Sequence, residues 1–152
     1  MITTIDSVKN NEKIVVLVTG ASGYIALHCV QQLLENGYTV RGTVRSLQNS
    51  SKVNPLRDLK YSSERLELVE ADLECSDHWH RAVDGCTYIL HIASPWPIVA
   101  DEGIIKIARD GTLNVLKAAA KCGTIQKIIL TSSTAAINGK YFGRNKLNQN
   151  LK

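Results

Sequence analysis

The sequence has no long hydrophobic run, since a helix that spans a bilayer needs about 20 consecutive apolar residues and none of that length occurs among the 152 residues. Residues 1–13 also lack the apolar core of a secretory signal and the Arg-rich, acid-poor character of a transit peptide, because they include Asp6, Lys9, Glu12 and Lys13. We therefore expect a flexible leader over residues 1–12, no membrane contact and a cytoplasmic location.

Paired cysteines are missing as well. The chain has four cysteines but no CxxC motif and no paired spacing; they are Cys29, Cys75, Cys86 and Cys122. This pattern argues against a disulfide framework and against a zinc site. It favours reduced thiols, most of them buried.

Metal-ligand clusters are equally scarce. The segment Asp77-His78-Trp79-His80 has two histidines two positions apart, which do not share a helix face, and no third ligand is close in sequence. We expect an exposed helix there, with Trp79 half-buried and no metal. His91 falls inside an apolar run, where a core histidine with satisfied hydrogen bonds is favoured over a ligand.

Most of the chain has no net charge. The formal net charge is +4, and residues 139–152 contain four basic residues and no acid. A neutral body argues against a nucleic-acid-binding surface, and four basic residues without interleaved aromatics are weak support for binding to nucleic acid or to an acidic membrane. Because the apolar pattern stops after Ala136, we expect a disordered basic tail over residues 138–152.

Between these ends the sequence alternates short apolar runs with helical patterns, and apolar residues make up an ordinary 44%. The runs predict strands at residues 13–19, 38–45, 66–70, 87–93 and 126–132. Helices are predicted at residues 24–36, around 55–59, at 76–83 and at 101–122, the last with its apolar side formed by Ile104, Ile107, Ala108, Leu113, Leu116 and Ala120. This order indicates one α/β domain over residues 13–137, a three-layer, doubly wound parallel sheet of the Rossmann type with about five strands.

The first predicted strand ends in a glycine turn, TGASGYIA, with the pattern Gly20-x-x-Gly23-x-x-Ala26. Gly20 allows the sharp strand-to-helix turn, Gly23 lets a pyrophosphate approach the backbone, and Ala26 lets the helix pack on the strand. The phosphates then meet the free N–H groups at the helix N-terminus. The competing interpretation is a tight turn without a ligand, but the position between a strand and a helix favours dinucleotide binding.

The end of the second predicted strand indicates which dinucleotide. An NAD site usually has an acidic residue about 20 residues after the glycines, whereas here Arg45 follows Gly23 by 22 positions, with Arg41 before it and Lys52 beyond. A guanidinium binds a 2′-phosphate through charge-assisted hydrogen bonds, and a carboxylate would repel it. The sequence therefore predicts NADP as the cofactor; the alternative is that Arg45 is only a solvated charge.

Several segments together resemble the extended short-chain dehydrogenase/reductase family, of the NAD-dependent epimerase/dehydratase type. The resemblance is to its dihydroflavonol-4-reductase and cinnamoyl-CoA reductase branch. It lies in VLVTGASGYIA, LLENGYTVRGTVRS, VEADL, AVDGCTYILHIASP, GTLNVLKAA and IILTSSTAAI, which lie between residues 14 and 137.

The resemblance implies an NADP-dependent reductase of carbonyl substrates and a role for each matching residue. Arg45 and Lys52 correspond to contacts of the 2′-phosphate, Asp72 and Leu73 to the pair that meets the adenine, and Ser133 to the catalytic serine. The other residues assigned to the cofactor lie in the glycine turn, after the fourth strand and after the fifth: Gly20, Ser22, Gly23, Tyr24, Ile25, Ala93, Ser94, Pro95, Thr131 and Ser132.

The family's proton donor is a Tyr-x-x-x-Lys pair some tens of residues after the serine, and this chain departs from that pattern. Nineteen residues follow Ser133; Tyr141 is their sole tyrosine, and Asn145 stands four residues after it. We expect a truncated product that lacks the later strands and the substrate region. Two functions stay open: an incomplete NADP-dependent reductase, or a non-catalytic NADP-binding or partner-binding pseudoenzyme. We also expect self-association through the uncovered edge of the sheet.

Overall fold

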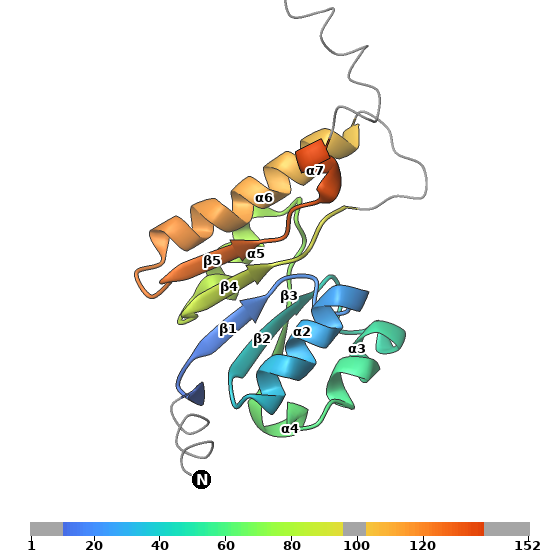
Figure 1. The fold of residues 1–152 in the computed structure, drawn as a ribbon, viewed down its shortest axis with the longest axis vertical. Helices are drawn as coiled ribbons and strands as arrows, with labels where there is room; N and C mark the ends of the chain where they lie inside the picture. Colours follow the sequence, from blue (N-terminus) through green and yellow to red (C-terminus); the bar gives the residue numbers. More distant parts are fainter. Residues whose placement is uncertain (1–10, 96–102, 139–152) are drawn as a thin grey trace, which may run out of the picture.

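The computed structural model describes residues 11–95 and 103–138, and the predicted doubly wound sheet is confirmed (Figure 1). Five strands form one sheet in the order β3-β2-β1-β4-β5, and all four neighbouring pairs are parallel. The strands are β1 (Val15–Val18), β2 (Thr39–Val44), β3 (Leu66–Glu70), β4 (Tyr88–His91) and β5 (Lys127–Leu130). Because the order reverses between β1 and β4, their carboxyl ends form the topological switch point where such sheets bind ligands.

The helices are close to the predicted ones, with two differences. They are α2 (Tyr24–Glu35), α3 (Ser50–Arg57), α4 (Ser62–Arg65), α5 (Ser76–Val83), α6 (Gly103–Lys121) and α7 (Thr134–Asn138). The short helix predicted around residues 55–59 is present as α3, but it begins five residues earlier and contains Pro55; the short helix α4 was not predicted. Val53 and Leu56 of α3 are fully buried, so tertiary packing compensates for the hydrogen bond that Pro55 cannot make. The predicted leader and tail lie outside the described residues, except for residues 11, 12 and 138.

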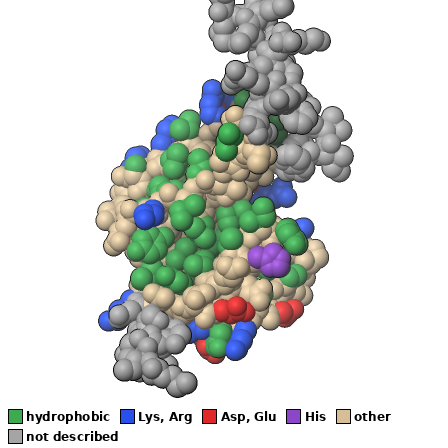
Figure 2. Space-filling model, in the orientation of Figure 1, with side chains coloured by type: hydrophobic (Ala, Val, Ile, Leu, Met, Phe, Trp, Pro, Cys, Tyr) green, Lys and Arg blue, Asp and Glu red, His purple; other side chains and the backbone are tan. Residues whose placement is uncertain are grey.

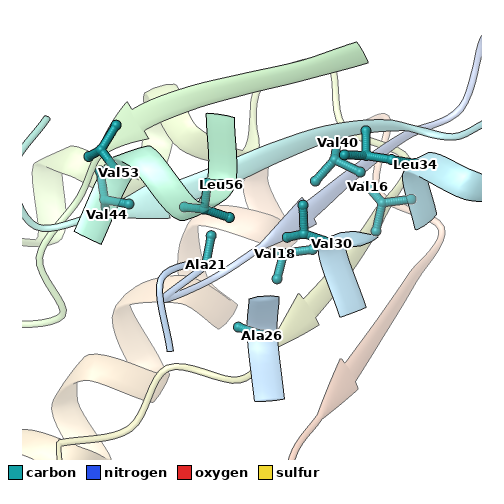
Figure 3. Close-up of a cluster of buried hydrophobic side chains, with 10 residues drawn as sticks. All are labelled: Val16, Val18, Ala21, Ala26, Val30, Leu34, Val40, Val44, Val53 and Leu56. Atoms are coloured by element: carbon teal, nitrogen blue, oxygen red, sulfur yellow. The ribbon is translucent and has the colours of Figure 1, made fainter. Parts of the chain in front are cut away.

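Alternate residues of β1 point to opposite faces of the sheet and so belong to two separate cores. Val16 and Val18 pack with α2 and α3, as Figure 3 shows, whereas Leu17 packs with α5 and α6. Figure 1 shows the corresponding layers, with α2 and α3 on one face and α5 and α6 on the other. The sheet between two helical layers is thus held by buried apolar area on both sides, the main favourable term in folding.

Trp79 lies deeper in the second core than predicted. It is 1% exposed rather than half-buried, and its indole Nε1 donates a hydrogen bond of 3.1 Å to the carbonyl oxygen of Asp72. This bond satisfies the indole N–H and allows the whole ring to leave water. The cysteines are less buried than predicted: Cys86 is buried, but Cys29, Cys75 and Cys122 are only half-buried.

The apolar side predicted for the long helix was partly wrong. The side of α6 that faces the sheet buries Gly111, Val115, Ala118 and Ala119, whereas Leu113 is 40% exposed and Ala120 is exposed. A Cβ added at Gly111 would lie 2.7 Å from Cβ of Leu73, so this helix approaches its neighbours closely. Such a close approach needs small residues on the buried side of the helix. A prediction based on the large apolar residues therefore places the buried side wrongly.

The sheet is not covered equally on its two faces. Figure 2 shows hydrophobic side chains gathered over the part of the sheet beside α2. Strand β5 forms one edge of the sheet. Its Ile129 and Leu130 are 55% and 51% exposed, and Ile129 pairs with Leu90 of β4. None of the described helices is both long enough and apolar enough to cross a bilayer.

Candidate dinucleotide-binding site

The glycine turn lies at the carboxyl end of β1 and is held by β2. Gly20 has φ of +64°, a left-handed conformation that favours glycine, and its N–H donates a hydrogen bond of 2.9 Å to Oγ1 of Thr43. The N–H of Ala21 donates to the carbonyl oxygen of Thr43 at 2.8 Å, and Gly23 N–H closes the turn on the carbonyl oxygen of Gly20 at 2.9 Å. The turn is therefore fixed by the backbone and side chain of one threonine.

The N-terminus of α2 is open to an anion. Gly23 is its N-cap residue, no side chain caps the helix, and the first turn contains no acidic residue. The first N–H groups of a helix have no intrahelical acceptor, and the helix dipole favours negative charge there. Ala26 is 1% exposed and packs with Val16 and Val18, which confirms its predicted packing role. Ser22 is half-buried, and Tyr24 and Ile25 are 81% and 58% exposed beside this end.

The tight turn favours glycine at position 23, in addition to the predicted approach of a pyrophosphate. A Cβ at this position would lie 3.2 Å from the carbonyl oxygen of Gly20, inside the turn itself. The turn is thus too tight for a side chain to be added without a shift of its own backbone.

Thr19 joins the two strands that flank the switch point. Its Oγ1 accepts hydrogen bonds of 3.0 Å from the N–H groups of Ile92 and Ala93, and it lies 2.9 Å from Nδ1 of His91. Because the oxygen accepts from two N–H groups, the hydroxyl proton is donated to Nδ1, and the neutral imidazole carries its proton on Nε2. A Cβ at Gly20 would lie 3.1 Å from Cβ of Ala93, so the turn and the loop after β4 are in direct contact.

His91 is a core histidine, as predicted, but only one of its ring nitrogens is satisfied. The residue is 1% exposed, and Nε2 has no hydrogen-bond partner within the described part of the chain. Burial lowers the pKa of its imidazole, because the charged form would lose hydration. His91 therefore serves the site in its neutral form.

The basic residues at the end of β2 have different roles. Arg45 and Lys52 are both exposed, Arg45 directly after β2 and Lys52 in the first turn of α3. Arg41 instead turns toward the opposite end of the sheet, where its Nε donates to Glu67 at 2.7 Å and its Nη1 donates to the carbonyl oxygen of Ala82 at 3.2 Å. Arg41 is thus a structural residue, whereas the side chains of Arg45 and Lys52 have no hydrogen-bond or ion-pair partner in the part of the chain that the structure describes.

The turn after β3 carries the residues assigned to the adenine. Oδ1 of Asp72 accepts the N–H of Glu74 at 2.9 Å, and the backbone N–H of Asp72 donates to Nδ1 of His78 at 3.2 Å. Nδ2 of Asn114 on α6 donates to the carbonyl oxygen of Leu73 at 2.8 Å. His78 therefore serves this turn, and no group of three potential metal ligands occurs in residues 11–95 and 103–138.

The residues assigned to the nicotinamide end follow β4 and β5. Ala93 and Pro95 are half-buried and Ser94 is exposed, whereas Thr131, Ser132 and Ser133 are all exposed. The N–H of Thr131 donates to the carbonyl oxygen of His91 at 3.0 Å, and the carbonyl oxygen of Ser133 accepts the N–H of Ala136 at 2.9 Å as α7 begins. The two segments thus lie side by side beyond the carboxyl ends of neighbouring strands.

The fold therefore brings the sequence-predicted residues to one edge of the sheet, with one of them following each strand: Gly20, Arg45, Asp72, Ala93 and Thr131. Sequence reasoning missed the residues that fix this edge from behind, namely Thr19 and Thr43. A signal was present, because each threonine is at or next to the carboxyl end of its strand. Their hydroxyls are buried where only a hydrogen bond to the site backbone can satisfy them.

A parallel sheet in this order, with a glycine turn and an open helix N-terminus at its switch point, defines a Rossmann-type dinucleotide-binding domain. Residues 16–148 match the family described as "NAD dependent epimerase/dehydratase family". The chain belongs to that family.

Several of the relatives and solved structures that the chain resembles are reductases. The chain is 40% identical over 131 residues to dihydroflavonol 4-reductase of Zea mays, covering 84% of this chain and 37% of the relative. It is 45% identical over 131 residues to cinnamoyl-CoA reductase CAD2 of Medicago truncatula, covering 83% and 40%. The crystal structure of Gre2 from Candida albicans in complex with NADPH superposes with a TM-score of 0.68 at 37% identity, covering 81% and 38%. The chain spans about two fifths of the length of the relatives it matches.

Proposed function

We propose that residues 13–137 form an NADP(H)-binding domain. The single observation that carries this proposal is a pair of exposed cations, Arg45 directly after β2 and Lys52 in the first turn of α3, together with a glycine turn whose helix has no acidic residue in its first turn. Pyrophosphate would lie on the N–H groups at the start of α2, and the 2′-phosphate between the two cations. The NADPH complex of the similar Gre2 structure supports this choice.

We further propose that the domain is the cofactor half of a cytoplasmic oxidoreductase that acts on carbonyl and CH–OH groups. The names of the similar relatives, dihydroflavonol 4-reductase and cinnamoyl-CoA reductase, support a small-molecule carbonyl substrate. When bound, NADPH supplies the hydride. The exposed Ser133 would donate a hydrogen bond that orients the carbonyl, with Thr131 and Ser132 beside the nicotinamide.

Proton transfer to the forming alkoxide needs a further group. None of the five tyrosines is followed by a lysine four positions later, since those positions hold His28, Gly42, Arg65, Ile92 and Asn145. A positioned general acid contributes about 10²–10⁴ in rate. We therefore propose that the chain by itself binds NADPH and consumes it only at trace level with aldehydes, ketones or dihydroflavonols. The alternative is a non-catalytic NADP-binding or partner-binding pseudoenzyme. In that case, adding a separate polypeptide that supplies the Tyr-x-x-x-Lys pair would not restore turnover.

Calorimetric titration of the purified chain with NADPH and with NADH tests the cofactor proposal. Arg45→Glu should weaken NADPH binding about 10- to 100-fold, because it replaces a charge-assisted hydrogen bond with repulsion. Arg81→Glu is the matched control, since Arg81 is an exposed arginine on α5 and the same charge change there should leave both affinities unchanged. Equal affinities of the unmodified chain for NADPH and NADH would overturn the proposal.

A further inference from the structure

Glu70 holds the backbone of the loop that leads from β2 to α3. It is the last residue of β3 and pairs in the ladder with Val44, the last residue of β2. Its Oε1 accepts a hydrogen bond of 2.7 Å from the backbone N–H of Leu47. The side chain of one strand thus reaches across the end of the sheet and fixes the loop of its neighbour.

The held segment is the one that presents Arg45. Only Arg45 and Ser46 lie between Val44, which the ladder fixes, and Leu47, which Glu70 fixes. The side chain of Leu47 is partly buried against the core beneath α3, so the far end of the segment is held by packing as well. Two further hydrogen bonds run within the loop, from the N–H of Gln48 to Oγ of Ser46 at 3.3 Å and from the N–H of Asn49 to the carbonyl oxygen of Ser46 at 3.4 Å.

The loop held by this bond leads directly into α3, whose first turn contains Lys52. Leu47 is three residues before α3, and the N–H of Lys52 donates to the carbonyl oxygen of Asn49 at 3.0 Å in the first turn. A loop that loses its anchor at Leu47 can move Arg45 and Lys52 independently, and two cations bind one phosphate well only when their separation is already set. An acidic residue close to a phosphate site is unfavourable by charge alone, so its hydrogen bond must supply the compensating advantage.

We propose that Glu70 is a positioning residue for the 2′-phosphate of NADP(H), acting through its hydrogen bond to the Leu47 N–H and not through its charge. The inference rests on the proposed NADP(H) function. The Glu70 carboxylate would have two opposing effects: its length lets it hold the loop, and its negative charge repels the phosphate.

Two substitutions separate these properties. Glu70→Gln keeps the length and an acceptor oxygen but removes the charge, whereas Glu70→Asp keeps the charge but is one methylene too short for the same contact. We expect E70D to weaken NADPH binding about threefold to tenfold, the loss that corresponds to one hydrogen bond, and to leave NADH binding unchanged because NADH has no phosphate there. We expect E70Q to bind NADPH at least as tightly as the unmodified chain. Glu64→Gln, on the exposed face of α4, is the charge-matched control and should change neither affinity.

Calorimetric dissociation constants for NADPH and NADH test the proposed role of Glu70. Thermal melts of each variant show whether it is folded. A selective loss of NADPH affinity in E70D with retention in E70Q supports the assignment. Equal weakening of both dinucleotides in E70D, no weakening at all, or a loss in E70Q as large as in E70D would overturn it while leaving the NADP(H) proposal intact. If the unmodified chain bound neither dinucleotide, the proposed function would fail, and this inference with it.

Discussion

At the scale of single residues, the site is shaped by side chains that would not contact the cofactor. Thr19 and Thr43 are both buried, and their hydroxyls bind the backbone of the loop after β4 and of the glycine turn. The Thr19 hydroxyl accepts from two backbone N–H groups and the Thr43 hydroxyl from one, so these N–H groups are satisfied where the chain turns sharply. The exposed residues that we propose to bind the cofactor therefore depend for their geometry on the two buried threonine hydroxyls.

We expect His91 to make the stability of the domain depend on pH. Burial lowers its folded-state pKa below the ordinary value of 6.5, so the unfolded chain binds a proton first as the pH falls. The contribution of His91 is thus fully present above about pH 6.5 and is lost below it, at most about 1.4 kcal/mol per pH unit. We expect urea unfolding to show a fall in the free energy of unfolding between pH 7 and pH 5.5.

His91→Asn is the comparison for this effect, because its Oδ1 can take the place of Nδ1 as the acceptor from Thr19. The variant should be less stable at pH 7.5 and should show a weaker pH dependence. An identical slope in both proteins would mean that other groups cause the effect.

Three glycines allow backbone strain to be separated from crowding. Gly85 has φ of +69° and nothing within 4 Å of an added Cβ, Gly20 has φ of +64° and a close neighbour in Ala93, and Gly123 has open space with no positive φ. Alanine should cost about 1–2 kcal/mol at Gly85 from the left-handed conformation alone, more at Gly20, and about nothing at Gly123. Equilibrium denaturation gives the three values, and a Gly20 variant no less stable than the Gly85 variant would contradict the packing at the switch point.

At the scale of elements, the strands were the most predictable part. Residues 66–70 and 76–83 form β3 and α5 as expected, because an apolar alternation and a helical pattern there are bounded by clear turn residues. The start of α3 and the whole of α4 could not be foreseen, because they are stabilised by tertiary contacts. Val53 and Leu56 are buried in the core with residues of β1 and β2, and the buried Ser62 donates its hydroxyl to the carbonyl oxygen of Arg57. The site followed the same rule: residues on the glycine turn and at strand ends were identified, whereas the long-range contacts of Thr43 and Glu70 became visible only in three dimensions.

The close approach of α6 to the turn after β3 is an element-scale feature with its own test. Gly111→Ala would place a Cβ 2.7 Å from Cβ of Leu73 and so push the helix away from the turn that Asn114 holds. Overpacking of this kind costs about 1–3 kcal/mol. Denaturant unfolding should show that loss, whereas Lys117→Ala on the exposed side of α6 should stay within about 0.5 kcal/mol.

At the scale of the whole molecule, the face beside α2 and the edge at β5, which no helix or strand among the described residues covers, form one hydrophobic region (Figure 2). Unpaired strand edges associate readily with a second chain. We expect the purified chain to self-associate with increasing concentration in sedimentation velocity experiments.

Ile129→Lys should reduce that association, because it places a charge in the middle of the exposed strand. Ile105→Lys makes the same change at a residue that is 67% exposed on α6, away from this face, and should leave association as it was. A monomer at all concentrations, or an equal effect of both variants, would show that the edge is not the contact.

The hydroxyl bridge between Thr19 and His91 has a consequence for synthesis on the ribosome. The two residues are 72 positions apart, and the intervening chain forms α2, β2, α3, α4, β3 and α5. The glycine turn and its helix emerge first, but the wall formed by the loop after β4 is absent until that strand has left the exit tunnel and inserted beside β1. A nascent chain that ends before residue 91 would therefore present the glycine turn without the other side of the proposed site, and we expect dinucleotide binding only after both halves of the sheet have been made.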